Sequence, residues 1–293
     1  MRKKPILLIS LLVGFFFVFI LLTLFVSLLF REKRDIVLSK EKIAVVEISG
    51  MILDSEEIIA QIEQFSEDSS VKAIILRIDS PGGGVVPAQE IYKEIMKVRN
   101  QGKKVVVSMG SVAASGGYYI AAASDKIIAN PGTITGSIGV IMEFSNVQEL
   151  MRKVGLKTEI IKSGKFKGIG APTRPLTEED KEVLKKLIDD VYEQFIEAVS
   201  NGRKISKEKV RRLADGRIYS GRQSIELGLV DGLGNLNDAI SEAAKMVGIK
   251  GKPRIVKEEI KKSLLSRLLD TKLSRFVDTG NGFQFKLQYI WPY

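Results

Sequence analysis

The sequence predicts an α/β fold whose strands run parallel in a sheet covered by helices on both faces. Apolar stretches alternate with segments of helical periodicity, which is typical of successive strand–helix–strand units. The strand-like stretches are continuous runs of Ala, Val, Ile and Leu, as expected where both faces of a sheet are buried. Clusters of glycine and serine follow several of them and allow tight turns there.

The first half of the domain should contain four strands separated by three helices. The apolar runs predict strands at 43–48, 73–78, 105–109 and 126–129. Apolar residues at helical spacing predict a helix over 58–65, and Ser55 precedes it as a candidate N-terminal cap. Further helices are expected over 87–98 and 115–123.

The second half should begin with a strand at 158–161 and then a long helix. Thr177 is placed to cap the helix, and the acidic residues at 178–180 suit its positive end. Asn201-Gly202 is expected to stop it. The helix carries an apolar stripe that we expect to pack in the core or against a second copy; it comprises Val183, Leu184, Leu187, Ile188, Val191, Phe195, Ile196 and Val199.

The N-terminal segment predicts an uncleaved membrane anchor. Residues 5–30 contain no charge, and this run exceeds the roughly 20 residues that a helix needs to cross a bilayer. The bulky sequence at its end lacks the small residues of a signal-peptide cleavage site. Basic residues at 2–4 favour a cytoplasmic N-terminus, so the domain is expected outside the cell membrane.

Composition narrows the possible chemistry. The 293-residue chain is 45% hydrophobic and 27% charged, as in globular proteins, but contains no histidine and no cysteine. Catalysis by a Ser–His–Asp triad or a Cys–His pair is therefore excluded, as is a zinc site built from these residues. The net charge of +10 has no accompanying nucleic-acid motif, so we expect no nucleic-acid partner.

Three clusters of small or basic residues could carry chemistry. The run Asp79 to Gly84 follows a strand, where an ordinary turn is the simpler interpretation. In the run Ser108 to Gly117, a serine at the start of a helix could meet a substrate, although tight helix packing would explain the same residues. The third run, Lys162 to Gly170, could be a solvated loop; a lysine acts as a base only where burial or neighbours lower its pKa from about 10.4 towards neutrality.

Taken in order, these clusters resemble the signal peptide peptidase A family of serine peptidases. The resemblance covers roughly residues 42–245 and rests on six motifs: Ser80-Pro81-Gly82-Gly83-Gly84, Ala114-Ser115-Gly116-Gly117-Tyr118-Tyr119, Thr135-Gly136-Ser137-Ile138-Gly139, Ser163-Gly164-Lys165-Phe166-Lys167, Asp215-Gly216-Arg217-Ile218-Tyr219-Ser220-Gly221 and Gly228-Leu229-Val230-Asp231. It implies the ClpP/crotonase fold, a repeated ββα superhelix.

The resemblance also implies the role of each site residue. Ser115 matches the nucleophile and Lys167 the general base, with Lys165 as a less well-fitting rival. Ser137 matches the serine that orients the lysine amine. The amides of Gly83 and Gly116 would form the oxyanion hole.

The implied function is a membrane-bound serine endopeptidase that degrades signal-peptide remnants and other apolar peptides through an acyl-enzyme. No metal or organic cofactor is expected. The resemblance further implies a ring-like homo-oligomer with active sites at subunit borders. Three other readings stay open: an acyl-CoA enzyme of the crotonase type, a related serine–lysine protease acting on a membrane scaffold partner, and a non-catalytic, membrane-tethered assembly protein.

These inferences divide the chain into five parts. A basic segment (1–4), the transmembrane anchor (5–30) and a tether (31–41) precede the catalytic domain (42–250). A C-terminal stretch (251–293) is expected to form a basic amphipathic helix followed by an apolar tail. One hypothesis is that this tail, Phe283 to Tyr293, enters the substrate groove of its own chain or of a neighbour.

Overall fold

The computed structural model describes residues 14–23, 41–257 and 288–290. Its centre is an eight-stranded sheet with the path β7-β6-β4-β2-β1-β9, to which β5 and β8 are added beside β4. The pairs on this sheet are parallel except β6 with β7. The strands are β1 (Lys42–Ser49), β2 (Val71–Ser80), β4 (Lys104–Ala114), β5 (Lys126–Ala129), β6 (Ile134–Gly136), β7 (Ile218–Ser220), β8 (Gly232–Leu233) and β9 (Arg254–Lys257).

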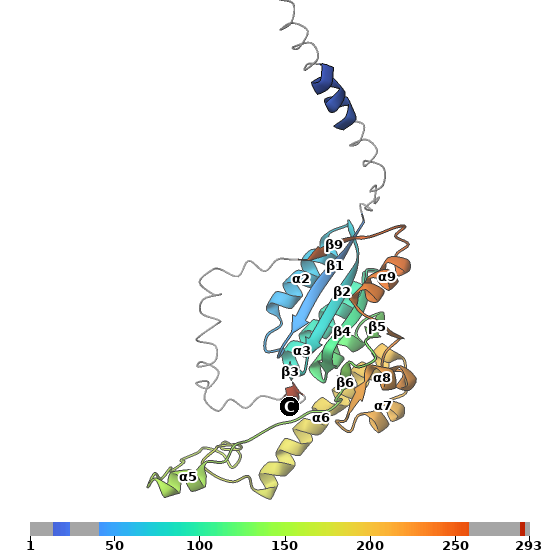
Figure 1. Cartoon of the computed structure of the whole chain (residues 1–293). Helices are drawn as coiled ribbons and strands as arrows, with labels where there is room; N and C mark the ends of the chain where they lie inside the picture. Colours follow the sequence, from blue (N-terminus) through green and yellow to red (C-terminus); the bar gives the residue numbers. More distant parts are fainter. Residues whose placement is uncertain (1–13, 24–40, 258–287, 291–293) are drawn as a thin grey trace, which may run out of the picture.

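Helices cover both faces of the sheet, as the apolar strands predicted (Figure 1). The larger core lies against α2 (Glu56–Glu67), α3 (Val85–Asn100), α4 (Gly116–Ala122) and the long α6 (Glu178–Arg203). Alternate residues of the same strands face α9 (Leu236–Met246) across the sheet. Because successive side chains of a strand point to opposite faces, runs of Val and Ile fill both cores. The remaining helices are α5 (Gln148–Lys153), α7 (Lys207–Leu213) and α8 (Gly221–Leu227).

The long helix α6 begins as predicted. The Thr177 hydroxyl accepts a hydrogen bond from the Asp180 amide at 3.1 Å, and the Asp180 carboxylate accepts one from the Thr177 amide at 3.1 Å. Arg174 also binds this carboxylate, so the ion pair and the cap bonds lower the pKa of Asp180 to about 2. This buried aspartate therefore joins the start of α6 to the chain that precedes it.

Residues 139–176, between β6 and α6, form an arm that contains α5. Figure 1 shows α5 and the loops around it at the far end of α6, away from the sheet. The arm's two branches are joined by a hydrogen bond from the Val147 amide to the Pro172 carbonyl at 2.8 Å. Apolar side chains of the arm are exposed; they include Leu150, Val154, Leu156 and Ile161.

Three expectations about local structure were wrong. Residues 158–161 are not a strand, since the arm offers them no neighbouring strand to pair with. Helix α6 does not stop at Asn201-Gly202: a Cβ on Gly202 would lie 1.9 Å from the Ala122 carbonyl oxygen, so this glycine permits close packing on α4. Ser55 does not cap α2 with its side chain, because its hydroxyl binds Glu90 instead.

The predicted anchor, residues 5–30, lies largely outside the described residues. Within it, residues 14–23 are helical, and the Thr23 hydroxyl donates to the Phe19 carbonyl at 3.1 Å. In the described parts of the chain, no helix combines the length and apolar character that crossing a membrane requires. The expected amphipathic helix of the C-terminal stretch also lies outside the described residues, whereas β9 continues the sheet as far as Lys257.

Candidate active site

Ser115 stands where β4 ends and α4 begins, in a backbone conformation that side chains disfavour. Its φ of 52° and ψ of −115° place it among the few non-glycine residues with positive φ. Such a conformation costs about 1–3 kcal/mol and persists only where the surroundings enforce it. Here the Ser115 amide donates to the Gly136 carbonyl at 2.8 Å, and its carbonyl accepts from the Tyr119 amide at 2.8 Å.

The Ser115 hydroxyl is buried and unpaired. The residue is 1% exposed, and among the described residues its Oγ has no hydrogen-bond partner. Buried hydroxyls normally find a partner, because leaving one unpaired costs free energy. A strained, buried serine whose hydroxyl has no partner among the described residues is typical of a functional site.

A carboxylate that the motif analysis left without a role shapes the end of β4. The pairing of β2 with β4 shifts register between Ile78 and Ser80. Asp79 at this shift accepts a hydrogen bond from the Val112 amide at 3.0 Å. A Cβ on Gly110 would lie 2.6 Å from the Asp79 Cγ, so only glycine leaves room for the carboxylate. In the sequence, the position of Asp79 directly before Ser80-Pro81-Gly82 was the only indication of this role.

Ser137 lies beside Ser115, because the two serines follow adjacent strands. The register of β4 and β6 pairs Ala114 with Gly136, so the two serines follow paired residues. Ser137 has a φ of 49°, and its amide donates to the Arg217 carbonyl at 2.8 Å. A Cβ on Gly136 would lie 2.6 Å from the Tyr219 ring, so this ring closes one side of the turn.

The short strand β3 (Gly82–Gly84) presents an open edge near this turn. The Gly82 carbonyl accepts from the Ile52 amide at 2.9 Å, and the Gly84 amide donates to the Ile52 carbonyl at 2.8 Å. Because backbone groups alternate in direction along a strand, the amide and carbonyl of Gly83 point to the opposite edge. A Cβ on Gly83 would lie 2.2 Å from the Ile52 oxygen, so this position excludes any side chain. Gly116 is buried as the first residue of α4.

The edge of β3 that faces away from Ile52 is paired with the C-terminal segment of the same chain. Strand β10 (Gln288–Ile290) runs antiparallel to β3, with Tyr289 opposite Gly83. Adding an extended segment to an exposed strand edge is a common way of recognising peptides, because main-chain hydrogen bonds do not depend on side-chain identity. The edge at Gly83 therefore pairs with an extended segment in this structure.

Lys167 lies in the arm and is exposed. Its amide donates to the Gly164 carbonyl at 3.1 Å within a series of tight turns, and no hydrogen bond or ion pair joins its amine to a described residue. Its neighbour Lys165 is paired with Glu179 at 2.6 Å. The structure thus brings Ser115 and Ser137 together, but within one chain it does not bring the Lys167 amine into hydrogen-bond contact with Ser115.

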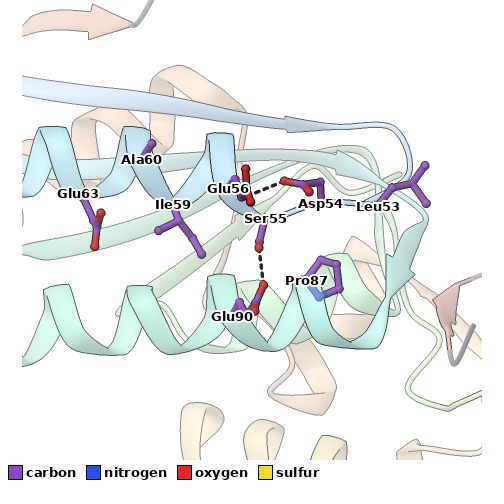
Figure 2. Close-up of a pocket in the computed structure, with 9 residues that line it drawn as sticks. All are labelled: Leu53, Asp54, Ser55, Glu56, Ile59, Ala60, Glu63, Pro87 and Glu90. Carbon is purple, nitrogen blue, oxygen red and sulfur yellow. Dashed lines mark hydrogen bonds between the residues drawn. The ribbon is translucent and has the colours of Figure 1, made fainter.

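Two pockets lie near these elements. One of about 550 Å³ begins at Ser137 and is lined by apolar residues of the arm base and of α6, with Asp189 and Asp215. The other, of about 450 Å³, lies between α2 and α3 and is acidic (Figure 2). There Ser55 binds Glu90, and the Glu56 amide donates to Asp54 at 2.7 Å. The acidic pocket contains none of the predicted site residues, and the described residues include no group of three or more Asp or Glu that could hold a metal ion.

Comparisons with known proteins identify the family of the chain. The model of peptidase family S49 matches residues 97–250, and the model of the Clp protease family matches residues 32–133, as the expected Clp-like α/β fold requires. A relative in Synechocystis sp., whose name describes a protease, is 42% identical over 244 residues, covering 82% of this chain and 88% of its own length.

Two longer relatives match more than two thirds of this chain. Protease 4 of Haemophilus influenzae is 38% identical over 70% of this chain, which spans 35% of that protein. Serine protease SPPA, chloroplastic, of Arabidopsis thaliana is 36% identical over 68% of this chain, which spans 30% of it. The matched family model covers more than half of the chain, including the strained serine and the arm. The chain therefore belongs to peptidase family S49, the signal peptide peptidase A family of serine proteases.

Proposed function

We propose that the protein hydrolyses peptides through an acyl-enzyme formed on Ser115, with Lys167 as the general base. The observation that carries the proposal is the strained, buried and unpaired hydroxyl of Ser115 at the end of β4. Strain of this kind is retained where it serves a site. A scaffold protein would have no need for it, since a glycine there would be free of the strain.

In the proposed reaction, the neutral Lys167 amine takes the proton from Ser115 as Oγ attacks the scissile carbonyl. The ammonium then protonates the leaving amine, and the acyl-enzyme remains. In the second half, the neutral amine takes a proton from water as the water oxygen attacks the acyl carbonyl. The bond from this carbon to Ser115 Oγ then breaks, and the ammonium returns the proton to Oγ, which releases the acid and regenerates Ser115. Ser137, beside Ser115, would accept or donate a hydrogen bond that orients the lysine amine.

The proposed oxyanion hole consists of the Gly83 and Gly116 amides. The bonds of Gly82 and Gly84 to Ile52 leave the Gly83 amide directed to the open edge of β3, where a substrate strand would lie. Each such donor typically contributes about 10²–10³ in rate. The pairing of β10 with this edge supports an antiparallel, extended substrate.

We further propose that a neighbouring copy supplies Lys167 in a ring-like homo-oligomer. The lysine lies in the arm, which extends away from the sheet (Figure 1). The arm and the adjoining half of α6 expose apolar side chains, among them Ile161, Val183 and Leu187. Exposed apolar surface on a protruding segment is typical of a protein–protein contact. Assembly would remove this surface from water and complete the catalytic pair.

The proposed substrates are signal-peptide remnants and other apolar peptides left after preprotein processing. An uncharged run at residues 5–30 would anchor the chain in the cell membrane, with its N-terminus in the cytoplasm and the catalytic domain outside. Such remnants partition into the same bilayer, so an anchored peptidase would meet them there. No metal or organic cofactor takes part in the proposed chemistry.

The test is peptidase activity of the full chain on a fluorogenic apolar peptide, beside Ser115→Ala, Lys167→Ala and Lys165→Ala. The parent and Lys165→Ala should cleave, and the other two variants should be inactive while keeping the parent's size. An active Lys167→Ala variant would exclude Lys167 as the base.

A further inference from the structure

We propose that Phe166 of one copy docks into the pocket beside Ser137 of the next copy and thereby positions Lys167. The inference rests on the proposed completion of the site by a second copy. It adds a specific contact, a partner surface and a positioning residue to that proposal.

The first step is the place of the pocket. Ser137, which would orient the lysine amine, is itself one of its lining residues. The lysine that must reach Ser137 and Ser115 follows Phe166 directly, and consecutive Cα atoms lie about 3.8 Å apart. Delivering Lys167 to the two serines therefore brings Phe166 to the mouth of this pocket.

The second step is the chemistry of the two surfaces. The pocket walls are apolar and include Val140, Ile141, Ile188 and the Tyr192 ring. The Tyr192 hydroxyl donates a hydrogen bond to the Ala214 carbonyl at 2.7 Å. Phe166 is 43% exposed in its own chain, with the Lys165 amine 5.6 Å from the ring centroid. An apolar ring beside the pocket would be removed from water by docking.

The third step is the charge at the pocket and the apolar surface that joins the pocket to the arm. Asp189 and Asp215 at the pocket are opposite in sign to the lysines on either side of Phe166, although each already pairs with a basic neighbour, Lys185 or Arg217. The exposed apolar side chains of α6, Val183 and Leu187, continue from the pocket towards the arm. An apolar surface thus extends from the pocket at Ser137 along α6 to the arm that carries Lys167.

The experiment uses mixed assemblies of two full-length chains. A Ser115→Ala chain donates Lys167, and a Lys167→Ala chain donates Ser115. Phe166→Ala on the lysine donor should lower kcat about 10- to 100-fold with KM unchanged, because a misplacement of the order of 1 Å is that costly. The same substitution on the serine donor is the matched control and should have no effect.

The pocket is tested in the reverse arrangement. Ile188→Arg should lower kcat when it is on the serine donor, whose pocket is used, and should have no effect on the lysine donor. Phe166→Leu, which keeps an apolar side chain, should restore most of the rate. All assemblies should keep the parent's size, which separates positioning from loss of the oligomer.

Three outcomes would overturn the inference. If Phe166→Ala has no effect on either chain while the mixture is active, the dyad is shared between copies but Phe166 does not position it. If Ile188→Arg on the serine donor acts through KM and Phe166→Ala does nothing, the pocket binds substrate. If the mixture is inactive although the two chains co-assemble, the proposed sharing of the dyad fails as well.

Discussion

The nucleophile end of the site and the arm that carries the candidate base differ in how firmly their own chain holds them. Ser115, Gly136 and Ser137 are buried, joined by backbone hydrogen bonds and enclosed by Tyr219. Lys167 is exposed in a loop whose neighbours include few core residues. Within one chain, the candidate nucleophile is therefore held firmly, whereas the candidate base stands in an exposed loop with no hydrogen bond to Ser115.

Holding the candidate nucleophile and the candidate base apart in the free chain would restrain a protease before it assembles. A serine whose base arrives only on assembly has no activated hydroxyl in the free chain, so an isolated subunit would not cleave peptides. The buried surroundings of Ser115 maintain its strained backbone. The arm, in contrast, exposes apolar side chains, which are suited to the proposed contact between copies.

The largest expected effects come from replacing Ser115 and Lys167. Both substitutions should lower kcat, but they should differ in their effect on the free energy of unfolding. Ser115→Gly and Lys167→Ala should each lower kcat by about 10⁴-fold or more. Ser115→Gly should also raise the free energy of unfolding by about 1 kcal/mol, because glycine adopts a positive φ without strain. Lys167→Ala removes an exposed side chain and should leave the unfolding free energy within about 0.5 kcal/mol. Peptidase assays and denaturant unfolding of both variants check this; a destabilised Ser115→Gly would contradict the strain.

The next effect concerns the oxyanion hole. Gly83→Ala should lower kcat about 10²- to 10³-fold, because the new Cβ would displace β3 from Ile52 and with it the Gly83 amide. Gly132→Ala is the control, since a Cβ there meets nothing within 4 Å. Steady-state kinetics on a short peptide measure both. Unchanged kcat in a folded Gly83→Ala protein would remove Gly83 from the site.

A smaller effect is expected from the C-terminal segment. Deleting residues 288–293 should increase the rate on a short peptide by about tenfold or less, because a tethered strand competes for the β3 edge through few hydrogen bonds. Rates of the full and shortened chains, and their labelling by a serine-directed inhibitor, measure this. Equal rates and equal labelling would mean that β10 does not occupy the substrate edge during turnover.

The smallest effect tests how the arm is joined to α6. Asp180→Asn should cost about 1 kcal/mol of unfolding free energy, since it weakens the cap and the Arg174 ion pair. The pKa of Asp180 is lowered in the folded state to about 2, so its contribution is complete above the unfolded pKa of about 3.9 and is lost as pH falls towards 2. Acid unfolding of parent and variant should therefore converge near pH 2. Parallel curves from pH 5 to pH 2 would contradict this linkage.

Much of the fold could be predicted because it depends on local pattern. Uninterrupted apolar runs indicated β1, β2, β4 and β5, and the cap at Thr177 indicated α6. Ser137 was indicated only through the family resemblance, because the short strand β6 that places it beside Ser115 was not predicted.

The parts that could not be predicted depend on contacts between distant segments. The role of Asp79 follows from a register shift that no periodicity reports. The tail was expected in a substrate groove, but its pairing with β3 could not be derived, because it joins segments about two hundred residues apart through backbone groups, which any sequence possesses. The arm was misread at 158–161 because an apolar β-branched pair, Ile160-Ile161, serves equally as a strand and as an exposed surface.

The most direct test of the central claim is whether two inactive chains restore activity together. Ser115→Ala and Lys167→Ala chains, co-assembled in equal amounts from the unfolded state, should regain peptidase activity at about a quarter of the sites, since random assembly pairs an intact serine with an intact lysine that often. Each chain alone should stay inactive. If the mixed assembly forms but does not cleave, the serine and its base belong to the same chain, and the division of the site between copies is wrong.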